Sequence, residues 1–449
     1  MVVCTALTVV AAGCGGGSKS SSSSNAEFAA QSSSQRSGEV LKIFGFSGGD
    51  DVAQNREAFT KRALAPAKVS TPPGNFDSQR FLTQWASGSI PDLVYLDRQQ
   101  VATLAAKKAL TPLEDCVAAQ HIDLSQYNQA ALREATYNGH LYALPEFTNQ
   151  RTLIVDLTAV RQAGLSLSDI STTNWNTLAR VTKKLTVEQG GRPTRIGFDP
   201  KLPEFFILWA HANGATLLSA DGLHAHLDSP KAIQALSFTK SLIDEQGGWA
   251  KFKSFRDTWD FFGAKNQVAQ NQVGAWPMES WYWNVMAQNS PDVDVAAVPF
   301  TDRHGKAFTY ISGNGWAIPA GAKNAALACT WMKTMTSVRA WMVAATKRAT
   351  ATKQAGQEFT GLYTANTAAD KKILGLVPKQ SNEWTNAVRT LTNVQQNAVF
   401  WPASPAGAQV QQALSDAIQR VLDGTQAPAA ALKQAQSQAQ QAIDSAKNG

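Results

Sequence analysis

The sequence predicts an α/β fold with two domains, and three observations lead to this prediction. The chain has 449 residues, of which 44% are hydrophobic and 17% charged, which is typical of a soluble globular protein long enough for two cores. From Glu39 onward, apolar segments of strand length alternate with segments of helical spacing. The apolar segment 91–96 is almost uninterrupted, as in strands buried within parallel sheets.

The predicted elements follow one another as strands and helices, and polar or glycine residues break each strand. Strands are expected at residues 40–46, 91–96, 142–145 and 152–156, and helices at residues 51–63, 77–87, 99–108 and 428–447. In open α/β sheets, ligands settle at the carboxyl ends of the strands. The residues that follow these strands are therefore candidates for a binding site.

The N-terminus has the pattern of an exported lipoprotein. An apolar run over residues 2–12 is too short to cross a bilayer, and small residues precede Cys14. Gly-rich and Ser-rich residues follow, as in flexible linkers. We expect a signal peptide at residues 1–13, a lipid on Cys14 and a flexible tether at residues 14–38, which together place the protein on the extracellular face of the cell membrane. The alternative is an ordinary secretion signal in which Cys14 has no special role.

Charge, histidine and cysteine content exclude several functions. The formal net charge is +7, but Lys and Arg are dispersed, so no nucleic-acid partner is expected. His224 and His226 are the only closely spaced histidines and have no Cys near them, so no metal or cofactor is expected. Cys116 and Cys329 remain in the mature chain, where they form either a disulfide or two buried free thiols.

Short motifs occur in a fixed order along residues 38–444. They are Gly-Ser-Ile-Pro-Asp-Leu-Val at 88–94, Leu-Thr-Pro-Leu at 110–113, Tyr-Ala-Leu-Pro at 142–145, Asn-Trp-Asn-Thr-Leu at 174–178, Gly-Asn-Gly-Trp-Ala-Ile-Pro at 313–319 and a closing helical segment at 413–420. In this order and spacing, the chain resembles the extracellular solute-binding proteins of family 1, the maltose-binding-protein-like receptors of ABC importers.

The resemblance implies a two-lobed, periplasmic-binding-protein-like (type II) α/β fold with discontinuous lobes. Lobe 1 would comprise residues 39–148 and about 308–363, and lobe 2 residues 151–300 and about 371–449. Hinge crossings are expected near Asn149, at residues 301–306 and at residues 364–370. The implied protein is a non-enzymatic, monomeric receptor that captures a carbohydrate, in the first place an oligosaccharide, and delivers it to the permease subunits of an ABC importer.

A sugar site needs aromatic rings against the apolar faces of the sugar and planar polar groups for its hydroxyls. The chain has 13 Trp, three of them within residues 276–283, where Pro277 favours an irregular loop. The aromatic candidates are Trp281, Trp283, Trp316 and Trp401, and the resemblance favours the first two and the last. The polar candidates at strand ends and at the first crossing are Phe46 with Ser47, Asp97 with Arg98, and Asn149 with Arg151. Asp97 has a second interpretation, as the cap of the following helix.

Other functions stay open on the residues alone. Residues 45–49 match the G-x-S-x-G pattern of serine hydrolases, but that motif normally follows several strands, so a tight turn close to a ligand is favoured here. A glycosidase needs two carboxylates about 5 to 10 Å apart, and no segment singles out such a pair. A receptor of the same fold for a polyamine, peptide or phosphodiester is the main alternative, and salt-sensitive affinity would identify it.

Overall fold

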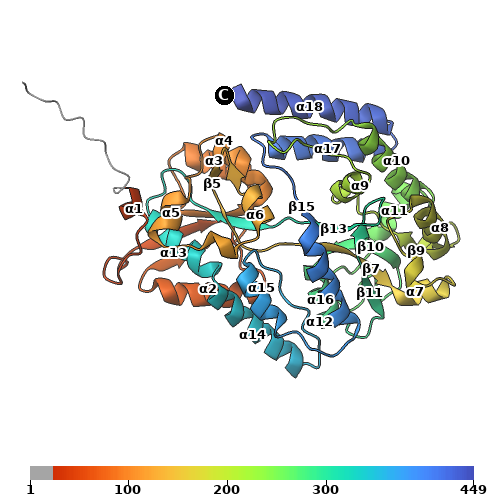
Figure 1. The fold of residues 1–449 in the computed structure, drawn as a ribbon, viewed down its shortest axis with the longest axis horizontal. Coiled ribbons are helices and arrows are strands. Elements are labelled where there is room, and N and C mark those ends of the chain that lie inside the picture. The colour runs from red at the N-terminus through yellow and green to blue at the C-terminus, as the bar shows by residue number, and fades with distance from the viewer. Residues whose placement is uncertain (1–23, 449) are drawn as a thin grey trace, which may run out of the picture.

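Two five-stranded sheets organise the computed structural model, which describes residues 24–448 (Figure 1). The first contains β1 Val40–Phe44, β2 Lys68–Ser70, β3 Leu93–Asp97, β6 Leu144–Pro145 and β14 Asn314–Ala317, in the order β2-β1-β3-β14-β6. The second contains β7 Arg151–Asp156, β8 Val187–Gln189, β9 Arg192–Phe198, β10 Val273–Glu279 and β11 Val295–Val298, in the order β11-β7-β10-β9-β8. The predicted α/β architecture is confirmed. The predicted signal peptide and Cys14 lie outside the described residues.

Lobe 1 is the part of the chain that packs around the first sheet. Its helices are α1 Ser24–Glu27, α2 Asp51–Leu64, α3 Ser78–Ala86, η1 Arg98–Gln100, α4 Val101–Ala106, α5 Glu114–Ala119, η2 Leu124–Gln126, α6 Gln129–Glu134, α13 Ala325–Met335, α14 Val338–Gln354 and α15 Thr367–Leu374, with a hairpin of β4 Thr136–Tyr137 and β5 His140–Leu141. Cys116 on α5 and Cys329 on α13 form a disulfide with an S–S distance of 1.99 Å. The structure thus selects the disulfide over two free thiols.

Lobe 2 packs around the second sheet. Its helices are α7 Leu157–Gln162, η3 Leu167–Asp169, α8 Trp175–Leu185, α9 Phe206–Ala212, α10 Pro230–Asp244, α11 Trp249–Arg256, α12 Trp281–Asn289, α16 Glu383–Val394, η4 Gln395–Asn397, α17 Gly407–Leu422 and α18 Pro428–Asn448. Every residue of β7 is buried, because helices cover both faces of this sheet. The terminal helix predicted at residues 428–447 is confirmed as α18.

The chain passes between the lobes at three places within the described residues. These are residues 146–150 before β7, residues 311–313 before β14 and residues 375–382 before α16. A small sheet of β12 Phe300–Thr301, β13 Ala307–Tyr310 and β15 Ala398–Val399 lies beside the second passage. The second and third passages lie further along the chain than expected, because Phe308 packs in the lobe 2 core and Ile373 in the lobe 1 core.

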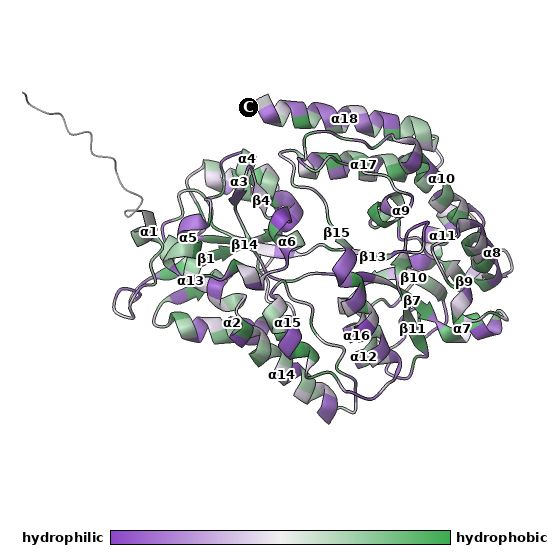
Figure 2. Cartoon of the chain, viewed as in Figure 1, coloured by the Kyte–Doolittle hydropathy of each residue, from purple (hydrophilic) through white to green (hydrophobic). Residues whose placement is uncertain are grey.

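Hydrophobic residues concentrate at the centre of each lobe. Figure 2 shows hydrophobic residues concentrated in the strands of both sheets, whereas α18 carries many polar residues. Such amphipathic helices bury one stripe against the core and expose the other. None of the helices in the part of the chain that the structure describes is long and apolar enough to span a membrane.

The prediction of an irregular loop at residues 276–283 is wrong. Strand β10 runs through Pro277 to Glu279, and α12 starts at Trp281. Proline has no backbone N–H and cannot donate a hydrogen bond to a neighbouring strand. It is tolerated at this position because no neighbouring strand would accept that hydrogen bond. Pro277 and Ala275 point their backbone groups to the same side, toward β9, and β9 ends at Phe198, which pairs with Ala275.

The prediction that residues 14–38 form a tether without a folded role is wrong for its described part. Helix α1 and the residues that follow it pack on lobe 1, and the Phe28 side chain is only 4% exposed within the lobe 1 core. The Gln120 amide donates a hydrogen bond of 2.9 Å to the Phe28 carbonyl. One buried aromatic residue among the serines therefore helps to hold this segment on lobe 1, which its composition alone does not indicate.

Candidate functional site

A cavity of about 840 Å³ lies between the two lobes. Lobe 1 contributes the residues that follow β1 and β3 together with parts of α2 and α14, and lobe 2 contributes α12. Residues 146–149 of the first passage form the part of the wall that joins the lobes. The volume is within the range of about 300–1,000 Å³ that small-molecule sites occupy.

The turn after β1 brings the backbone close to this cavity. Gly45 has a φ of +87°, and a Cβ atom at this position would lie 2.6 Å from the Tyr95 carbonyl oxygen. Only glycine fits such a turn without strain. The turn places Phe46 and Ser47 in the cavity wall, and Asp50 then caps α2 by accepting a hydrogen bond of 2.8 Å from Ala53.

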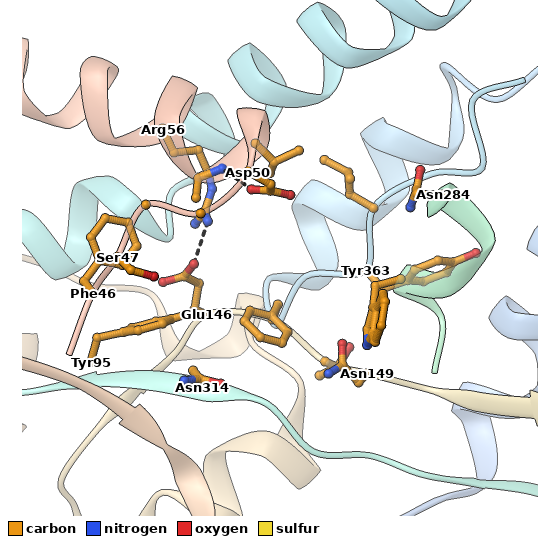
Figure 3. Close-up of a pocket in the computed structure, with 18 of the residues that line it drawn as sticks. Phe46, Ser47, Asp50, Arg56, Tyr95, Glu146, Asn149, Asn284, Asn314 and Tyr363 are labelled. Atoms are coloured by element: carbon orange, nitrogen blue, oxygen red, sulfur yellow. Dashed lines mark hydrogen bonds and ion pairs between the residues drawn. The ribbon is translucent and has the colours of Figure 1, made fainter. Parts of the chain in front are cut away.

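An ion pair forms the polar wall of lobe 1. The Arg56 guanidinium lies 2.5 Å from the Glu146 carboxylate, and the two side chains are 3% and 1% exposed. Figure 3 shows this pair with Ser47 and Tyr95 beside it. Burial, and secondly the charge of Glu146, raise the pKa of Tyr95 well above its usual value, so its hydroxyl keeps its proton.

A second ion-pair cluster lies at the edge of the same wall. Arg348 on α14 contacts Asp50 at 3.0 Å and also pairs with Asp51. The Arg348 side chain is mostly buried, whereas the two carboxylates are about half exposed. Both arginines that line the cavity, Arg56 and Arg348, are therefore already neutralised by carboxylates.

The opposite wall carries an aromatic platform. The half-buried Trp281 ring lies parallel to the Phe262 ring, with 6.0 Å between centroids and 18° between planes. Phe262 is 64% exposed, which is unusual for a large hydrophobic residue. The Trp281 indole N–H donates to Glu279 at 2.6 Å, and Glu279 accepts from Arg151 at 2.5 Å. The ring orientation is thus fixed by a buried arginine through one carboxylate.

A second hollow of about 520 Å³ lies beside this platform. Asp97, Phe262 and Trp281 line both spaces. Burial raises the pKa of Asp97, and its Oδ1 atom accepts a hydrogen bond of 2.9 Å from the Gln99 backbone. Asp97 therefore has both positions that the sequence suggests: it caps the helix that follows, and it lines the cavity.

The structure brings together part of the predicted set. The residues that line the main cavity are Phe46, Ser47, Asp97, Asn149 and Trp281. Arg151 lines only the continuing hollow, where its guanidinium also donates to the Tyr310 carbonyl at 3.0 Å. These residues come from the ends of β1 and β3, the first passage and the start of α12.

Arg98 is not in the cavity wall. Its side chain is fully buried and donates from Nε to Glu134 at 2.9 Å. A second nitrogen donates to the carbonyls of Phe147 at 2.7 Å and Asn314 at 3.2 Å. The Arg98 side chain therefore holds the first passage against the start of β14, which is a structural role.

Three predicted tryptophans also lie away from the cavity. Trp283 is two residues after Trp281 on α12, so it points about 200° around the helix axis and packs against Trp384. Trp316 is fully buried on β14, where its ring centroid lies 4.5 Å from that of Tyr95. Trp401 lines a separate hollow of about 100 Å³. The site described here does not include them.

Sequence reasoning missed several residues of the wall. Tyr95 shares with Asp97 the partly exposed face of β3, so strand alternation was a usable signal. Asn284 lies one helical turn after Trp281, which the expectation of a loop concealed. Phe262 and Tyr363 come from irregular segments whose sequence gives no such signal.

Comparison with known proteins shows that the chain matches one family model and is similar to many solved structures. The family model described as bacterial extracellular solute-binding protein matches residues 68–340. A search of curated proteins finds no match. CpMnBP1 with mannotriose bound has 22% identity and a TM-score of 0.72, with 89% of this chain and 100% of that chain covered.

Two further structures have the same fold. The ABC substrate-binding protein from Listeria monocytogenes in complex with cycloalternan has 16% identity and a TM-score of 0.74, with 90% of this chain and 99% of that chain covered. The maltose/maltodextrin-binding domain from Bdellovibrio bacteriovorus bound to maltotriose has 21% identity and a TM-score of 0.68, with 90% and 100% covered.

The family match covers more than half of the chain. The two lobes with a cavity between them agree with the fold of the similar structures. The predicted two-lobed fold and the predicted family are both confirmed. The chain belongs to the bacterial extracellular solute-binding proteins.

Proposed function

We propose that this protein is a receptor that binds a carbohydrate, in the first place an oligosaccharide, in the cavity between its lobes. The observation that supports this most directly is the exposed platform of Trp281 and Phe262 across from a polar wall. A sugar presents apolar C–H faces to aromatic rings and hydroxyls to planar polar groups. Asn149, Asn284 and Asn314 supply amides in the same cavity.

The charges of the cavity favour a neutral ligand. Arg56 and Arg348 are each paired with a carboxylate, so neither is free to bind an anion. Burial raises the pKa of Asp97, because it disfavours the charged form of the carboxyl group. A phosphodiester would need an unpaired positive charge in the wall, which neither arginine supplies.

The length of the ligand is inferred from the shape of the site. Because Trp281 and Phe262 line both hollows, a ligand stacked on them can extend toward either one. The similar structures with mannotriose, maltotriose and cycloalternan bound support an oligosaccharide. The similarity in fold alone does not identify the sugar.

The remaining parts of the proposal concern cellular role. The protein is a monomer that delivers its ligand to the permease subunits of an ABC importer and catalyses no reaction. It is held on the extracellular face of the membrane by a lipid on Cys14, which the N-terminal sequence pattern supports.

A thermal unfolding screen of residues 24–449 tests the proposal. The panel contains mannose and glucose oligosaccharides, monosaccharides, spermidine and a short peptide, each at low and high salt. A ligand at a hundred times its dissociation constant stabilises the folded state by about 2.7 kcal/mol, which raises the melting temperature. We expect a salt-insensitive shift with one class of oligosaccharide. A shift only with spermidine or the peptide, lost at high salt, would contradict the carbohydrate assignment.

A further inference from the structure

The turn between β9 and α9 holds one lysine in an unusual backbone conformation. Lys201 has a φ of +55°, which residues with a Cβ atom rarely adopt. The turn is fixed by Asp199, which is fully buried and accepts a hydrogen bond of 2.7 Å from the Lys201 backbone N–H. Backbone strain of this kind is concentrated at binding and active sites. The position of the Lys201 side chain is therefore a candidate for a functional role.

The Lys201 ammonium group is mostly buried and weakly paired. Its side chain is 12% exposed, and within residues 24–448 its one ion-pair partner is Glu204, at 3.5 Å, whose side chain is 53% exposed. The ammonium nitrogen lies 5.4 Å from the centroid of the Trp276 ring and 5.7 Å from that of the Phe261 ring. Aromatic faces attract a cation, but they leave its three N–H groups without a good hydrogen-bond acceptor. Because a buried charge without such partners is costly, the ammonium group has hydrogen bonds to offer a ligand.

The second hollow, which this ammonium group lines, lies at the carboxyl ends of two parallel strands. Lys201 and Glu204 form its wall together with Trp281 and Phe262 of the platform. Strands β9 and β10 are parallel neighbours, so the turn after β9 lies beside the end of β10, and Trp281 follows β10 in the chain. The carboxyl ends of parallel strands are where open α/β sheets bind ligands. A group bound in this hollow can therefore contact the platform and Lys201 together.

The charged groups of the second hollow suit a neutral ligand with hydroxyl groups. Its wall contains the carboxylates of Asp97, Glu204 and Glu279 but only two cations, Arg151 and Lys201. Arg151 is already paired with Glu279 at 2.5 Å, so an anionic substituent would meet more repulsion than attraction. Lys201 and Glu204 offer N–H donors and an oxygen acceptor 3.5 Å apart. Two hydroxyls on neighbouring carbons of a sugar ring can bond to both, because each hydroxyl both donates and accepts hydrogen bonds.

We propose that the second hollow is a subsite for a second sugar ring of the same oligosaccharide, and that Lys201 and Glu204 bind two neighbouring hydroxyls of that ring. The inference rests on the carbohydrate receptor proposed above and deepens it, since it assigns two specificity-determining residues. The ring in the main cavity and the ring in the second hollow then share the platform of Trp281 and Phe262. Ligands of two or more rings bind more tightly than single sugars.

Calorimetric titration with mannotriose, maltotriose and trigalacturonic acid tests the subsite. Lys201→Met keeps most of the length of the side chain and removes the ammonium group. We expect a roughly tenfold loss of affinity for the neutral trisaccharide that binds, as for a lost hydrogen bond to a charged group. Lys240→Met on α10 is the matched control, because Lys240 is also partly buried, pairs with Asp244 at 2.6 Å and lies outside the hollow. The control should bind the trisaccharide as tightly as the unchanged protein.

A second variant covers the case in which Lys201→Met fails to fold. Glu204→Ala removes a half-exposed carboxylate, which the fold should tolerate, and we expect a roughly fivefold loss of affinity for the same trisaccharide. In both variants, the advantage of the trisaccharide over the corresponding monosaccharide should become smaller, because the lost contacts belong to the second ring.

The outcomes separate this inference from the proposed function. A neutral trisaccharide that binds folded Lys201→Met or Glu204→Ala as tightly as the unchanged protein overturns the subsite but not the carbohydrate receptor. Binding of trigalacturonic acid that depends on Lys201, with neutral trisaccharides bound equally well without it, overturns the assignment of a neutral ring to this hollow. No binding of any oligosaccharide overturns the proposed function, and this inference with it.

Discussion

Glu279 shows how one carboxylate organises the wall of the cavity. One oxygen accepts from the Trp281 indole and the other from the nearly buried Arg151, so the ring position depends on the charge of the carboxylate. Hydrogen bonds to charged groups are about twice as strong as neutral ones. Glu279 need not touch the ligand itself, yet it holds Trp281, the residue that we propose stacks on it.

Glu279→Gln keeps the shape of the side chain and removes its charge. We expect the free energy of unfolding to fall by about 1 kcal/mol, because Arg151 loses its charged partner. Ligand affinity should fall by roughly fivefold, since the Trp281 ring is held less firmly. Chemical denaturation and calorimetric titration measure the two effects. An affinity equal to that of the unchanged protein would show that Trp281 does not depend on Glu279.

Asp370 gives the protein a pH-dependent stability. Burial raises the pKa of this carboxyl to about 7, although Thr364 donates a backbone hydrogen bond of 2.8 Å to it. A folded-state pKa above the unfolded value means that the folded protein binds more protons in between. The contribution to stability is therefore fully present below about pH 4 and is lost as the pH rises through about 7.

The variant Asp370→Asn should remove this dependence. The unchanged protein is expected to lose up to about 1.4 kcal/mol of stability per pH unit between about pH 5 and 7 from this group. Burial also raises the pKa of Asp156 to about 6, so part of the slope should remain in the variant. Denaturation curves at several pH values measure the slope. The same slope in both proteins would show that Asp370 titrates normally.

Residue-level prediction from sequence succeeded where position along a strand decides exposure. Ser47 lies just after β1 and Asp97 is the last residue of β3, and both line the cavity, as their positions at strand ends predict. It failed for Trp283 and Trp316, because a tryptophan in a wall and one in a core have the same sequence signature. Only the rotation along α12 separates Trp281 from Trp283.

At the level of elements, the segment after α14 connects the lobes. Phe359 and Leu362 attach it to the lobe 1 core. It reaches lobe 2 through three polar contacts, which are Gln357 to the Gln288 carbonyl at 2.6 Å, Asn284 to the Gly361 carbonyl at 3.3 Å and Asn382 to Glu358 at 3.0 Å. Two of them end on α12, the helix that starts with Trp281.

Removal of these contacts should loosen the lobes. The double variant Gln357→Ala with Glu358→Ala removes two hydrogen bonds, worth about 2 kcal/mol in total, or roughly 25-fold in an equilibrium between closed and open arrangements. We expect a larger radius of gyration in solution scattering and faster ligand release. Gln354→Ala, at the exposed end of α14, is the matched control. Identical scattering in both variants would show that the contacts do not hold the lobes.

Helices and strands could be predicted from the sequence where the spacing of their apolar residues is regular. Helix α2 and strand β3 lie within a few residues of their predicted ranges because apolar spacing and an Asp cap define them. The sequence did not predict the start of α12, because a proline usually interrupts a regular element, whereas Pro277 occupies a strand position at which its missing N–H has no partner. The sequence did not predict that residues 26–38 pack on lobe 1, because serines outnumber the one buried aromatic residue among them, Phe28.

At the scale of the whole molecule, the order of short motifs predicted the fold better than any single element did. The two lobes and the cavity between them follow from that order. The exact places of the second and third passages could not be read from sequence, since they depend on which core Phe308 and Ile373 join. Contacts between segments far apart in the chain decide this.

Calorimetric titration of Trp281→Ala with the oligosaccharide identified in the screen tests the central claim most directly. Trp85→Ala is the matched control, because Trp85 is also half-buried and its indole donates a hydrogen bond, to the Ala320 carbonyl at 3.0 Å, but it lies outside the cavity wall. We predict that Trp281→Ala weakens binding by about 1 kcal/mol or more, roughly fivefold in Kd, while Trp85→Ala leaves it unchanged. Equal affinity in a folded Trp281→Ala protein would contradict the account.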